Sequence, residues 1–156
     1  MEIAYYEMSY DDIPEVAELE LKYFSQPWSE SSIGHYMDQG NTIFLVARDC
    51  SRKADGTEHG TVVAYMALMC ILNESDLVSI AVHEDYRNMG LARELLDIAY
   101  GMARDIGVDM IHLEVRKSNE AAISLYESEG FVRDGLRKGF YDKPKEDALL
   151  YTKQLR

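Results

Sequence analysis

Cysteine is scarce in this chain, and so are several other features that mark specialised classes of protein. The 156 residues include two cysteines, Cys50 and Cys70, too few for a disulfide framework or for the cysteine spacing of a zinc site. We therefore expect reduced thiols in a cytoplasmic protein. The longest apolar run, residues 62–72, is too short to cross a bilayer as a helix. The first residues lack a basic segment ahead of an apolar one, so we expect no signal peptide and no membrane partner.

Basic residues are also in deficit. Lysine and arginine total 16 against 28 aspartates and glutamates, a formal net charge of −12, which argues against a uniformly basic surface for nucleic acid. The charge is unevenly spread: residues 1–40 hold nine acids and one base, whereas residues 133–156 hold seven bases and four acids. The acidic first third suits a cationic partner or substrate, and it equally suits a simple role in solubility.

Repeats, linkers and low-complexity segments are lacking as well, and the length predicts one domain over residues 1–156. Apolar periodicity predicts strands at 2–8, 41–49, 61–72, 74–84, 108–116, 131–141 and 147–156, with helices at 9–24, 29–40, 90–107 and 118–130. Asp55-Gly56 predicts a hairpin turn. Tyr23 falls in the apolar stripe of the first helix, and Ile106 in that of the third. Near its end, strand 74–84 is nearly all apolar, as in strands covered on both faces.

The resulting order, βααβββαβαββ, predicts an α/β fold with one βαβ unit at residues 75–116. The turn inside that unit, "YRNMGLAR" (86–93), joins a strand end to a helix start. Gly90 and Ala92 carry little side chain, so an anion can approach the unpaired N–H groups at the helix N-terminus, and Arg87 and Arg93 add positive charge. The turn matches neither the Gly-Lys-Ser/Thr phosphate loop nor the Gly-x-Gly-x-x-Gly dinucleotide motif. Taken alone, it is equally well explained as a tight turn that binds nothing.

The wider segment "SIAVHEDYRNMGLARELL" (79–96) resembles the acetyl-coenzyme A motif of the GNAT N-acetyltransferase superfamily, in which Arg/Gln-x-x-Gly-x-Gly/Ala binds the pyrophosphate. "HLEVRKSNEAAISLYESEGF" (112–131), "PWSE" (27–30) and "YDKPKEDALLY" (141–151) are similar to the RimI type, the ribosomal-protein-alanine N-acetyltransferases. The resemblance covers most of the chain and is strongest over residues 75–131; Ala92 replaces the commoner glycine. It implies the GNAT fold, a mixed and mostly antiparallel sheet of six to seven strands flanked by helices.

The resemblance also implies which residues hold acetyl-coenzyme A. The backbone of Ile80, Ala81 and Val82 would pair with the pantetheine arm, and a nearby N–H, exposed by a bulge, would hold the oxyanion. Asn119 would bind the same arm, although it also suits a helix N-cap, and the two roles are compatible. The pyrophosphate would be wrapped by Arg87, Asn88, Met89, Gly90, Leu91, Ala92 and Arg93.

Two residues carry the implied chemistry. Alternation along strand 108–116 places Glu114 opposite Ile111 and Val115, and the resemblance makes it the general base. An α-amine has a pKa of about 7.7–8.0 and must lose a proton before it attacks a thioester. The alternative for Glu114 is an ion pair or a solvated face. Tyr126 would act as general acid toward the thiolate or hydrogen-bond the sulfur, and its alternative is ordinary packing.

Trp28, Glu30 and Tyr141 are candidate substrate contacts, because the resemblance places their segments at the peptide entrance. The four histidines show no metal-ligand spacing, and we expect acetyl-coenzyme A as cosubstrate with no metal.

The predicted function is transfer of an acetyl group to the N-terminal α-amine, an alanine, of a small-subunit ribosomal protein, by direct attack in a ternary complex. We expect a monomer or weak dimer with no direct nucleic-acid partner. The alternatives are acetylation of lysine side chains or small amines, a non-catalytic module that binds acetyl-coenzyme A, and work beside a tRNA-modifying partner.

Overall fold

The part of the chain that the structure describes contains seven strands and four α-helices, in the order that the sequence predicts. The computed structural model describes residues 1–52 and 59–156, so the expected turn at Asp55-Gly56 lies outside the described residues. Two short 3-10 turns, η1 (Tyr10–Asp12) and η2 (Glu84–Tyr86), precede α1 and α3. The elements are β1 (Ile3–Glu7), α1 (Ile13–Tyr23), α2 (Glu30–Gln39), β2 (Thr42–Asp49), β3 (Thr61–Ile71), β4 (Glu74–Val82), α3 (Leu91–Asp105), β5 (Met110–Arg116), α4 (Glu120–Ser128), β6 (Val132–Tyr141) and β7 (Glu146–Gln154).

Short polar residues and glycines set the helix ends. Ser29 Oγ accepts the N–H of Ser32 at the start of α2, and Gly40 ends that helix in the left-handed conformation. The first helix starts later than predicted, because Asp12 Oδ2 accepts the Ser9 N–H at 2.8 Å and closes a 3-10 turn before Ile13.

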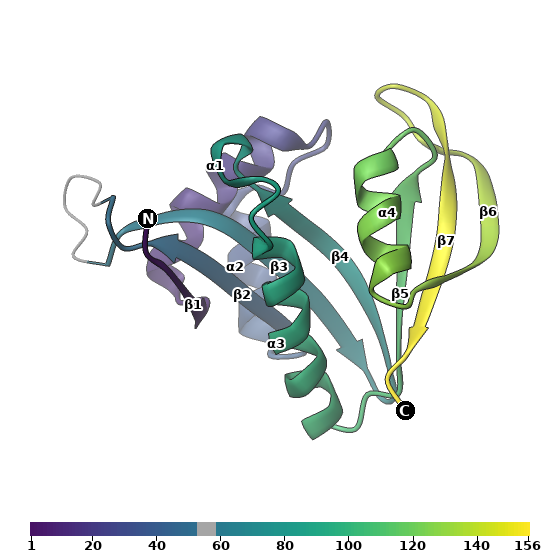
Figure 1. The fold of residues 1–156 in the computed structure, drawn as a ribbon, viewed down its shortest axis with the longest axis horizontal. Helices are drawn as coiled ribbons and strands as arrows, with labels where there is room; N and C mark the ends of the chain where they lie inside the picture. Colours follow the sequence, from purple (N-terminus) through teal and green to yellow (C-terminus); the bar gives the residue numbers. More distant parts are fainter. Residues whose placement is uncertain (53–58) are drawn as a thin grey trace.

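The strands form one sheet in the order β1-β2-β3-β4-β5-β7-β6. Among the strands of the described residues, only β4 and β5 pair in parallel, and α3 is the crossover between them, which confirms the βαβ unit. Their pairing covers three positions, from Glu74 with Met110 to Asp76 with His112. Beyond these pairs the two strands diverge, so the sheet opens into a V between β4 and β5 (Figure 1).

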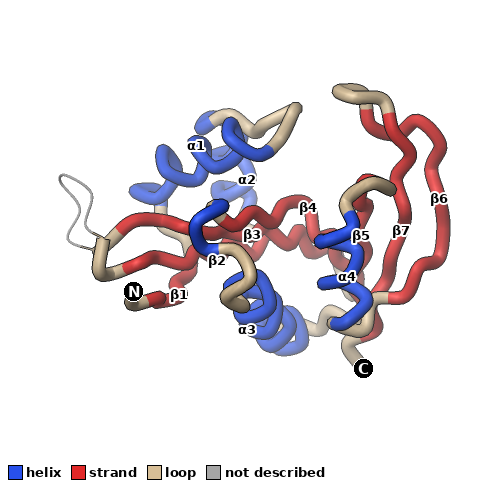
Figure 2. The backbone as a smooth tube through the Cα atoms, turned by 45° about the horizontal axis from the view of Figure 1, so that its top comes forward, coloured by secondary structure: helices blue, strands red, loops and turns tan. Residues whose placement is uncertain are grey.

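Helices cover both faces of the sheet, with α1 and α2 on one face and α3 and α4 on the other (Figure 2). Strand alternation explains the two cores: Leu45 of β2 packs with α3 and α4, whereas its neighbours Phe44 and Val46 pack with α1 and α2. On α3, Leu95 is fully buried as expected. Ile106 is 61% exposed, against expectation, because α3 ends at Asp105 and leaves it outside the helix. In the described parts of the chain, we find no helix with the length and apolar character needed to traverse a bilayer.

Candidate active site

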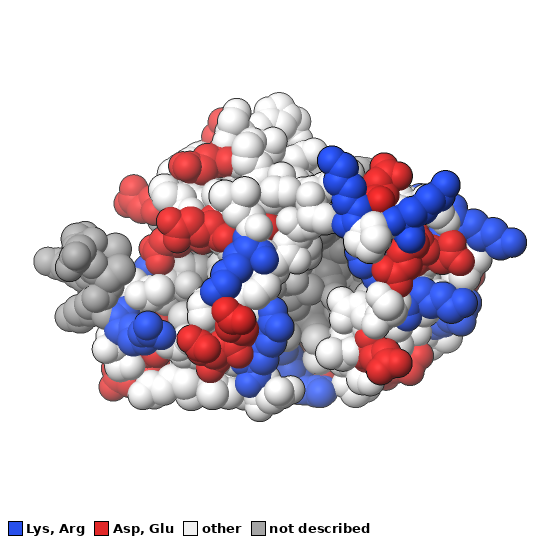
Figure 3. Space-filling model, turned by 90° about the horizontal axis from the view of Figure 1, so that it is seen from above, with Lys and Arg blue, Asp and Glu red and all other residues white. Residues whose placement is uncertain are grey.

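A cleft of about 1060 Å³ occupies the opening between β4 and β5. Residues 77–82 of β4 form one wall, residues 114–116 of β5 and the start of α4 form the other, and the η2–α3 turn closes one end. A space-filling view shows the hollow, with lysine and arginine side chains on both rims (Figure 3). The cleft crosses the sheet, so it joins the α3–α4 face to the α1–α2 face.

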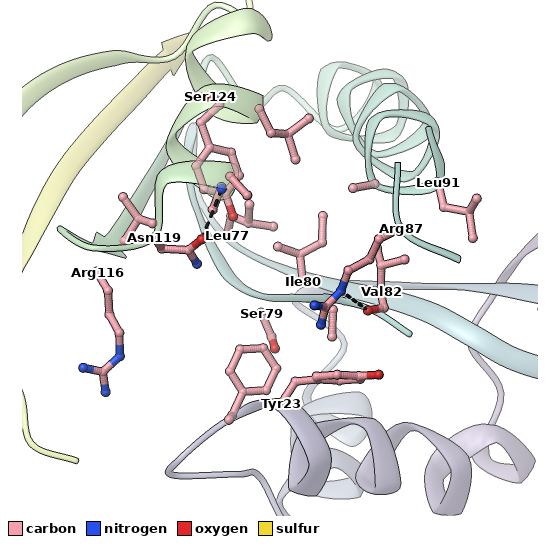
Figure 4. Close-up of a pocket in the computed structure, with 18 of the residues that line it drawn as sticks. Tyr23, Leu77, Ser79, Ile80, Val82, Arg87, Leu91, Arg116, Asn119 and Ser124 are labelled. Atoms are coloured by element: carbon pink, nitrogen blue, oxygen red, sulfur yellow. Dashed lines mark hydrogen bonds between the residues drawn. The ribbon is translucent and has the colours of Figure 1, made fainter. Parts of the chain in front are cut away.

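The β4 wall presents backbone to the cleft. Ile80, Ala81 and Val82 pair with β3 on one side, while β5 pairs with β4 only as far as Asp76 on the other. The Val82 carbonyl accepts a hydrogen bond from Arg87 Nε at 3.2 Å (Figure 4). Ile80 and Val82 are only half-buried, so the expectation of a strand covered on both faces is wrong at this end, because their side chains face the cleft.

β4 also contains a bulge. Ala67 of β3 pairs with Ser79 and Leu68 pairs with Leu77, so Val78 has no counterpart in the register. Val78 is 39% exposed and lines the cleft. A bulge turns a backbone N–H out of the strand ladder, so this residue fits the expected oxyanion donor.

The turn before α3 is shaped as an anion cradle. Asn88 and Gly90 have φ values of 62° and 82°, and Gly90 is the N-cap residue of α3, where it supplies no side-chain cap. A Cβ at Gly90 would meet no atom within 4 Å, so its positive φ, not crowding, demands glycine. Successive N–H groups of this kind form a concave site for anions at the positive end of the helix dipole.

The two arginines of the turn have separate partners. The Arg87 guanidinium lies 4.8 Å from the ring centroid of Tyr23 in α1. Arg93 Nη1 forms an ion pair with Glu129 at 2.6 Å, and Nη2 lies 3.1 Å from Ser128 Oγ. Arg93 therefore ties α3 to the end of α4, directly across the cleft.

Glu114 lies in the cleft on the α1–α2 face of β5. Ile111, Leu113 and Val115 point into the opposite core and are 1–5% exposed, which confirms the predicted alternation. The Glu114 side chain is 35% exposed and forms a long ion pair with Arg137 Nη1, at 3.9 Å. It does not pair with Arg116, which contacts Glu146 instead.

Tyr126 enters the cleft from α4, on the other face of the sheet. It is 6% exposed, its ring packs edge-on against Phe131 at 5.6 Å, and burial raises the pKa of its phenol, so the hydroxyl keeps its proton at neutral pH. Asn119 caps α4, where Oδ1 accepts the N–H of Ala122 at 3.2 Å (Figure 4). The N-cap role is thus confirmed.

The rim on the α1–α2 face holds one of the three candidate substrate contacts. Tyr141 lines the cleft. Trp28 does not, because its ring stacks on Tyr36 at 5.0 Å in the α1–α2 core. Glu30 is the exposed first residue of α2 and also lies outside the lining, as does Met89 of the cradle.

Several lining residues were not predicted as part of the site. Tyr23 was assigned to the helix stripe, yet it lines the cleft, and its hydroxyl accepts the Glu84 N–H at 2.8 Å. Ser79 of β4 also lines the cleft (Figure 4). The signal for Val78 was the adjacent pair Leu77-Val78, which interrupts the alternation expected of a regular strand. Within residues 1–52 and 59–156, histidines, cysteines and acids form no group of three or more arranged to hold a metal.

Comparison with known proteins places these features in a family. The model of the acetyltransferase (GNAT) family matches residues 13–131. The [ribosomal protein bS18]-alanine N-acetyltransferase of Escherichia coli (strain K12) is 33% identical over 141 residues, which cover 89% of this chain and 88% of the relative.

Solved structures agree with the sequence comparison. The crystal structure of the ribosomal-protein-S18-alanine N-acetyltransferase from Escherichia coli superposes with a TM-score of 0.82 at 28% identity, covering 99% of this chain and 94% of that one. The NatC complex bound to Gag peptide and CoA contains a chain with a TM-score of 0.85 at 25% identity, with full coverage of both.

Proposed function

Because this chain belongs to the acetyltransferase (GNAT) family, we propose that it acetylates the N-terminal α-amine of a protein with acetyl-coenzyme A as donor. The acceptor is the N-terminal alanine of ribosomal protein bS18, the substrate in the name of the Escherichia coli relative. One observation carries the proposal: a carboxylate, Glu114, and a protonated phenol, Tyr126, line the same cleft from opposite faces of the sheet.

The cleft fits acetyl-coenzyme A. The cradle from Asn88 to Gly90 suits the pyrophosphate, and the open backbone edge of Ile80–Val82 suits the amide-bearing pantetheine arm. The Asn119 side-chain nitrogen adds a donor at the start of α4, because only its oxygen is used in the cap. Acetyl-coenzyme A supplies an acetyl group as a thioester, which an amine can attack directly.

On the α1–α2 face, Glu114 accepts the proton that the ammonium group must lose, directly or through a water molecule. The new N–C bond forms as the C–S bond breaks, and the Val78 N–H stabilises the negative charge on the carbonyl oxygen. The nitrogen releases its second proton as the thiolate departs, to that thiolate or to water, which leaves a neutral amide and free coenzyme A. Attack by the free amine needs no acyl-enzyme, so the donor and the acceptor occupy the cleft together. The opening through the sheet provides that arrangement.

Tyr126 acts on the departing sulfur. Burial raises its pKa above the usual value of about 10 for a phenol. The gap to the pKa of a thiol, about 8.5, therefore widens. A phenol that holds its proton this firmly stabilises a thiolate as a hydrogen-bond donor. Of the two roles considered for Tyr126, we therefore assign hydrogen bonding ahead of complete proton transfer.

The test is an acetylation assay read by mass spectrometry. Purified protein and acetyl-coenzyme A are incubated with peptides that begin with free alanine, serine or methionine, and with an N-terminally blocked peptide that carries lysine. We expect acetyl on the α-amine of the alanine peptide and none on the blocked peptide. Acetylation of lysine alone would instead indicate a side-chain acetyltransferase. Cofactor binding without turnover on any amine would indicate a binding module.

A further inference from the structure

Arg116, the last residue of β5, contacts two loops that are distant in the sequence. Its Nη1 donates to the Pro144 carbonyl at 2.8 Å, and its Nη2 lies 3.4 Å from the Lys143 carbonyl, both in the β6–β7 loop. Nη2 also lies 3.4 Å from Ser25 Oγ in the α1–α2 loop. One guanidinium thus contacts both loops at the rim of the cleft on the α1–α2 face.

The same guanidinium holds an aromatic ring at the cleft. It lies 4.3 Å from the ring centroid of Tyr141, a distance at which a cation is attracted to the ring face. Tyr141, Glu114 and Tyr126 all line the cleft. Burial raises the pKa of the Tyr141 phenol, the Glu114 carboxylate adds to that rise, and Arg116 opposes it. The ring that Arg116 holds therefore borders the same cleft as both candidate reactive groups.

An ion pair extends these contacts to the cofactor side. Arg116 Nη1 lies 3.3 Å from Glu146 Oε1, and Glu146 Oε2 accepts the Ser118 N–H at 2.6 Å. Ser118 directly precedes Asn119, the N-cap of α4. The loops of the acceptor rim are thus connected, through one arginine and one glutamate, to the helix that carries Tyr126.

These contacts use properties that arginine alone offers. A surface ion pair needs one donor and one carboxylate, whereas Arg116 distributes its donors among two carbonyls, a hydroxyl and a carboxylate. A lysine ammonium is a point charge and cannot span both loops in one fixed plane. With its donors directed away, Arg116 leaves Glu114 on the same strand face with a long ion pair to Arg137, at 3.9 Å, and no closer cation among residues 1–52 and 59–156.

We propose that Arg116 is a positioning residue for the acceptor: it fixes the spacing of the α1–α2 and β6–β7 loops and holds Tyr141 at the wall of the cleft that Glu114 also lines. The inference rests on the proposed function, since it concerns how the acceptor amine reaches that site. Arg116 acts through the loops and through Tyr141. Glu146 still accepts the Ser118 N–H when Arg116 is replaced, so the start of α4 and acetyl-coenzyme A binding should be preserved.

The first test is steady-state kinetics of R116M, R116K and R133M with acetyl-coenzyme A and an alanine-initiated peptide. Arg133 is an exposed arginine of β6, so R133M is a matched control. We expect R116M and R116K to raise the peptide KM at least about tenfold with acetyl-coenzyme A affinity unchanged within about twofold, and R133M to match the unmodified protein. A wild-type peptide KM in R116K would show that charge suffices and would overturn the proposal. An equal loss of acetyl-coenzyme A affinity in R116M would also overturn it.

The second test does not depend on turnover. Hydrogen exchange of the backbone amides in residues 24–29 and 142–146 should quicken together in R116M and remain unchanged in R133M. Unchanged exchange, or a change in one loop alone, would overturn the positioning role. If the unmodified protein acetylates no amine, the proposed function fails, and the exchange measurement still decides whether Arg116 fixes the two loops.

Discussion

At the scale of single residues, the availability of Glu114 depends on its neighbours. Arg116 lies on the same face of β5 but bonds Pro144 and Glu146, so Glu114 keeps only the long contact with Arg137. The carboxylate that should act as a base is therefore not neutralised by a close ion pair, and it remains partly solvated at the mouth of the cleft.

Replacing Glu114 by glutamine keeps the shape of the side chain and removes the base. We expect kcat for an alanine-initiated peptide to fall by about 10²- to 10⁴-fold near pH 7, with acetyl-coenzyme A affinity unchanged. Activity should partly recover toward pH 9, because more of the α-amine is then already deprotonated. Steady-state rates across this pH range test the prediction, with E18Q on the exposed face of α1 as control. Near-wild-type turnover of E114Q at pH 7 would exclude Glu114 as the base.

Replacing Tyr126 by phenylalanine removes the hydroxyl alone, because the phenylalanine ring preserves the packing against Phe131. The free energy of unfolding of Y126F should lie within about 1 kcal/mol of that of the unmodified protein, since a single hydroxyl is removed. Its kcat should fall about 10- to 100-fold, the equivalent of about 1.5–3 kcal/mol for a hydrogen bond to a charged group. Urea unfolding and single-turnover rates measure the two quantities. A full-rate Y126F enzyme would assign Tyr126 to packing alone.

At the scale of elements, the two glycines of α3 make a matched pair. Gly90 at the N-cap has a φ of 82°, whereas Gly101 lies in the helix interior, and a Cβ meets no atom within 4 Å at either position. G90A should destabilise the fold by about 1–2 kcal/mol, because alanine pays to adopt the left-handed conformation. G101A should stabilise it by about 0.5–1 kcal/mol.

Gly90 lies in the cradle, whereas Gly101 lies in the interior of α3. G90A should therefore also weaken binding of acetyl-coenzyme A, and G101A should leave it unchanged. Calorimetric titration and urea unfolding of both variants separate the two effects. Equal affinities in both variants would mean that the turn does not hold the pyrophosphate.

The elements also show what a sequence can predict. Ser29 and Asn119 cap the starts of α2 and α4, and Gly40 terminates α2. These signals act within a few residues, so local patterns predicted both helices to within two residues at each end. The cleft has no such local signal, because it exists only where β4 and β5, far apart in the chain, cease to pair. Glu114 and Tyr126 were therefore assigned roles through the resemblance to a family, not through periodicity. The turn at Gly90 had a local signal, but that signal alone did not distinguish an anion site from a tight turn that binds nothing.

Trp28 illustrates the limit of that resemblance. The segment that contains it was expected at the peptide entrance, and the neighbouring Ser25 lines the cleft. The indole itself packs on Tyr36 and Phe44, because removing an apolar ring from water lowers its free energy. A motif thus located the loop but did not determine which of its side chains face the cleft.

At the scale of the whole molecule, one buried carboxylate joins the α1–α2 layer to the sheet. Glu20 of α1 is 3% exposed and accepts the Trp28 N–H and the Ser79 hydroxyl, each at 3.2 Å. Tyr65 of β3 donates to Ser79 at 2.7 Å and completes the network. Ser79 directly follows Val78 at the bulge of β4, so the network links the α1–α2 loop, the sheet and the proposed oxyanion donor.

This network predicts how stability depends on pH. Burial raises the pKa of Glu20, although hydrogen bonds from Trp28, Ser79 and Tyr65 oppose the shift. Between the unfolded value of about 4.3 and the raised folded value, the native state binds more protons than the unfolded chain, so this group makes stability fall as pH rises. Groups whose pKa is lowered, such as Glu146, act in the opposite sense on the acid side.

The contribution of Glu20 is isolated by comparing E20Q with the unmodified protein, because glutamine is neutral throughout. The free energy of unfolding of E20Q minus that of the unmodified protein should increase as pH rises above about 4.3, by at most about 1.4 kcal/mol per pH unit, and level off above the folded pKa. Urea unfolding from pH 4 to 8 measures the difference, with E18Q, at an exposed position of the same helix, as the control. Parallel curves for E20Q and the unmodified protein would show that Glu20 ionises as readily in the fold as in water.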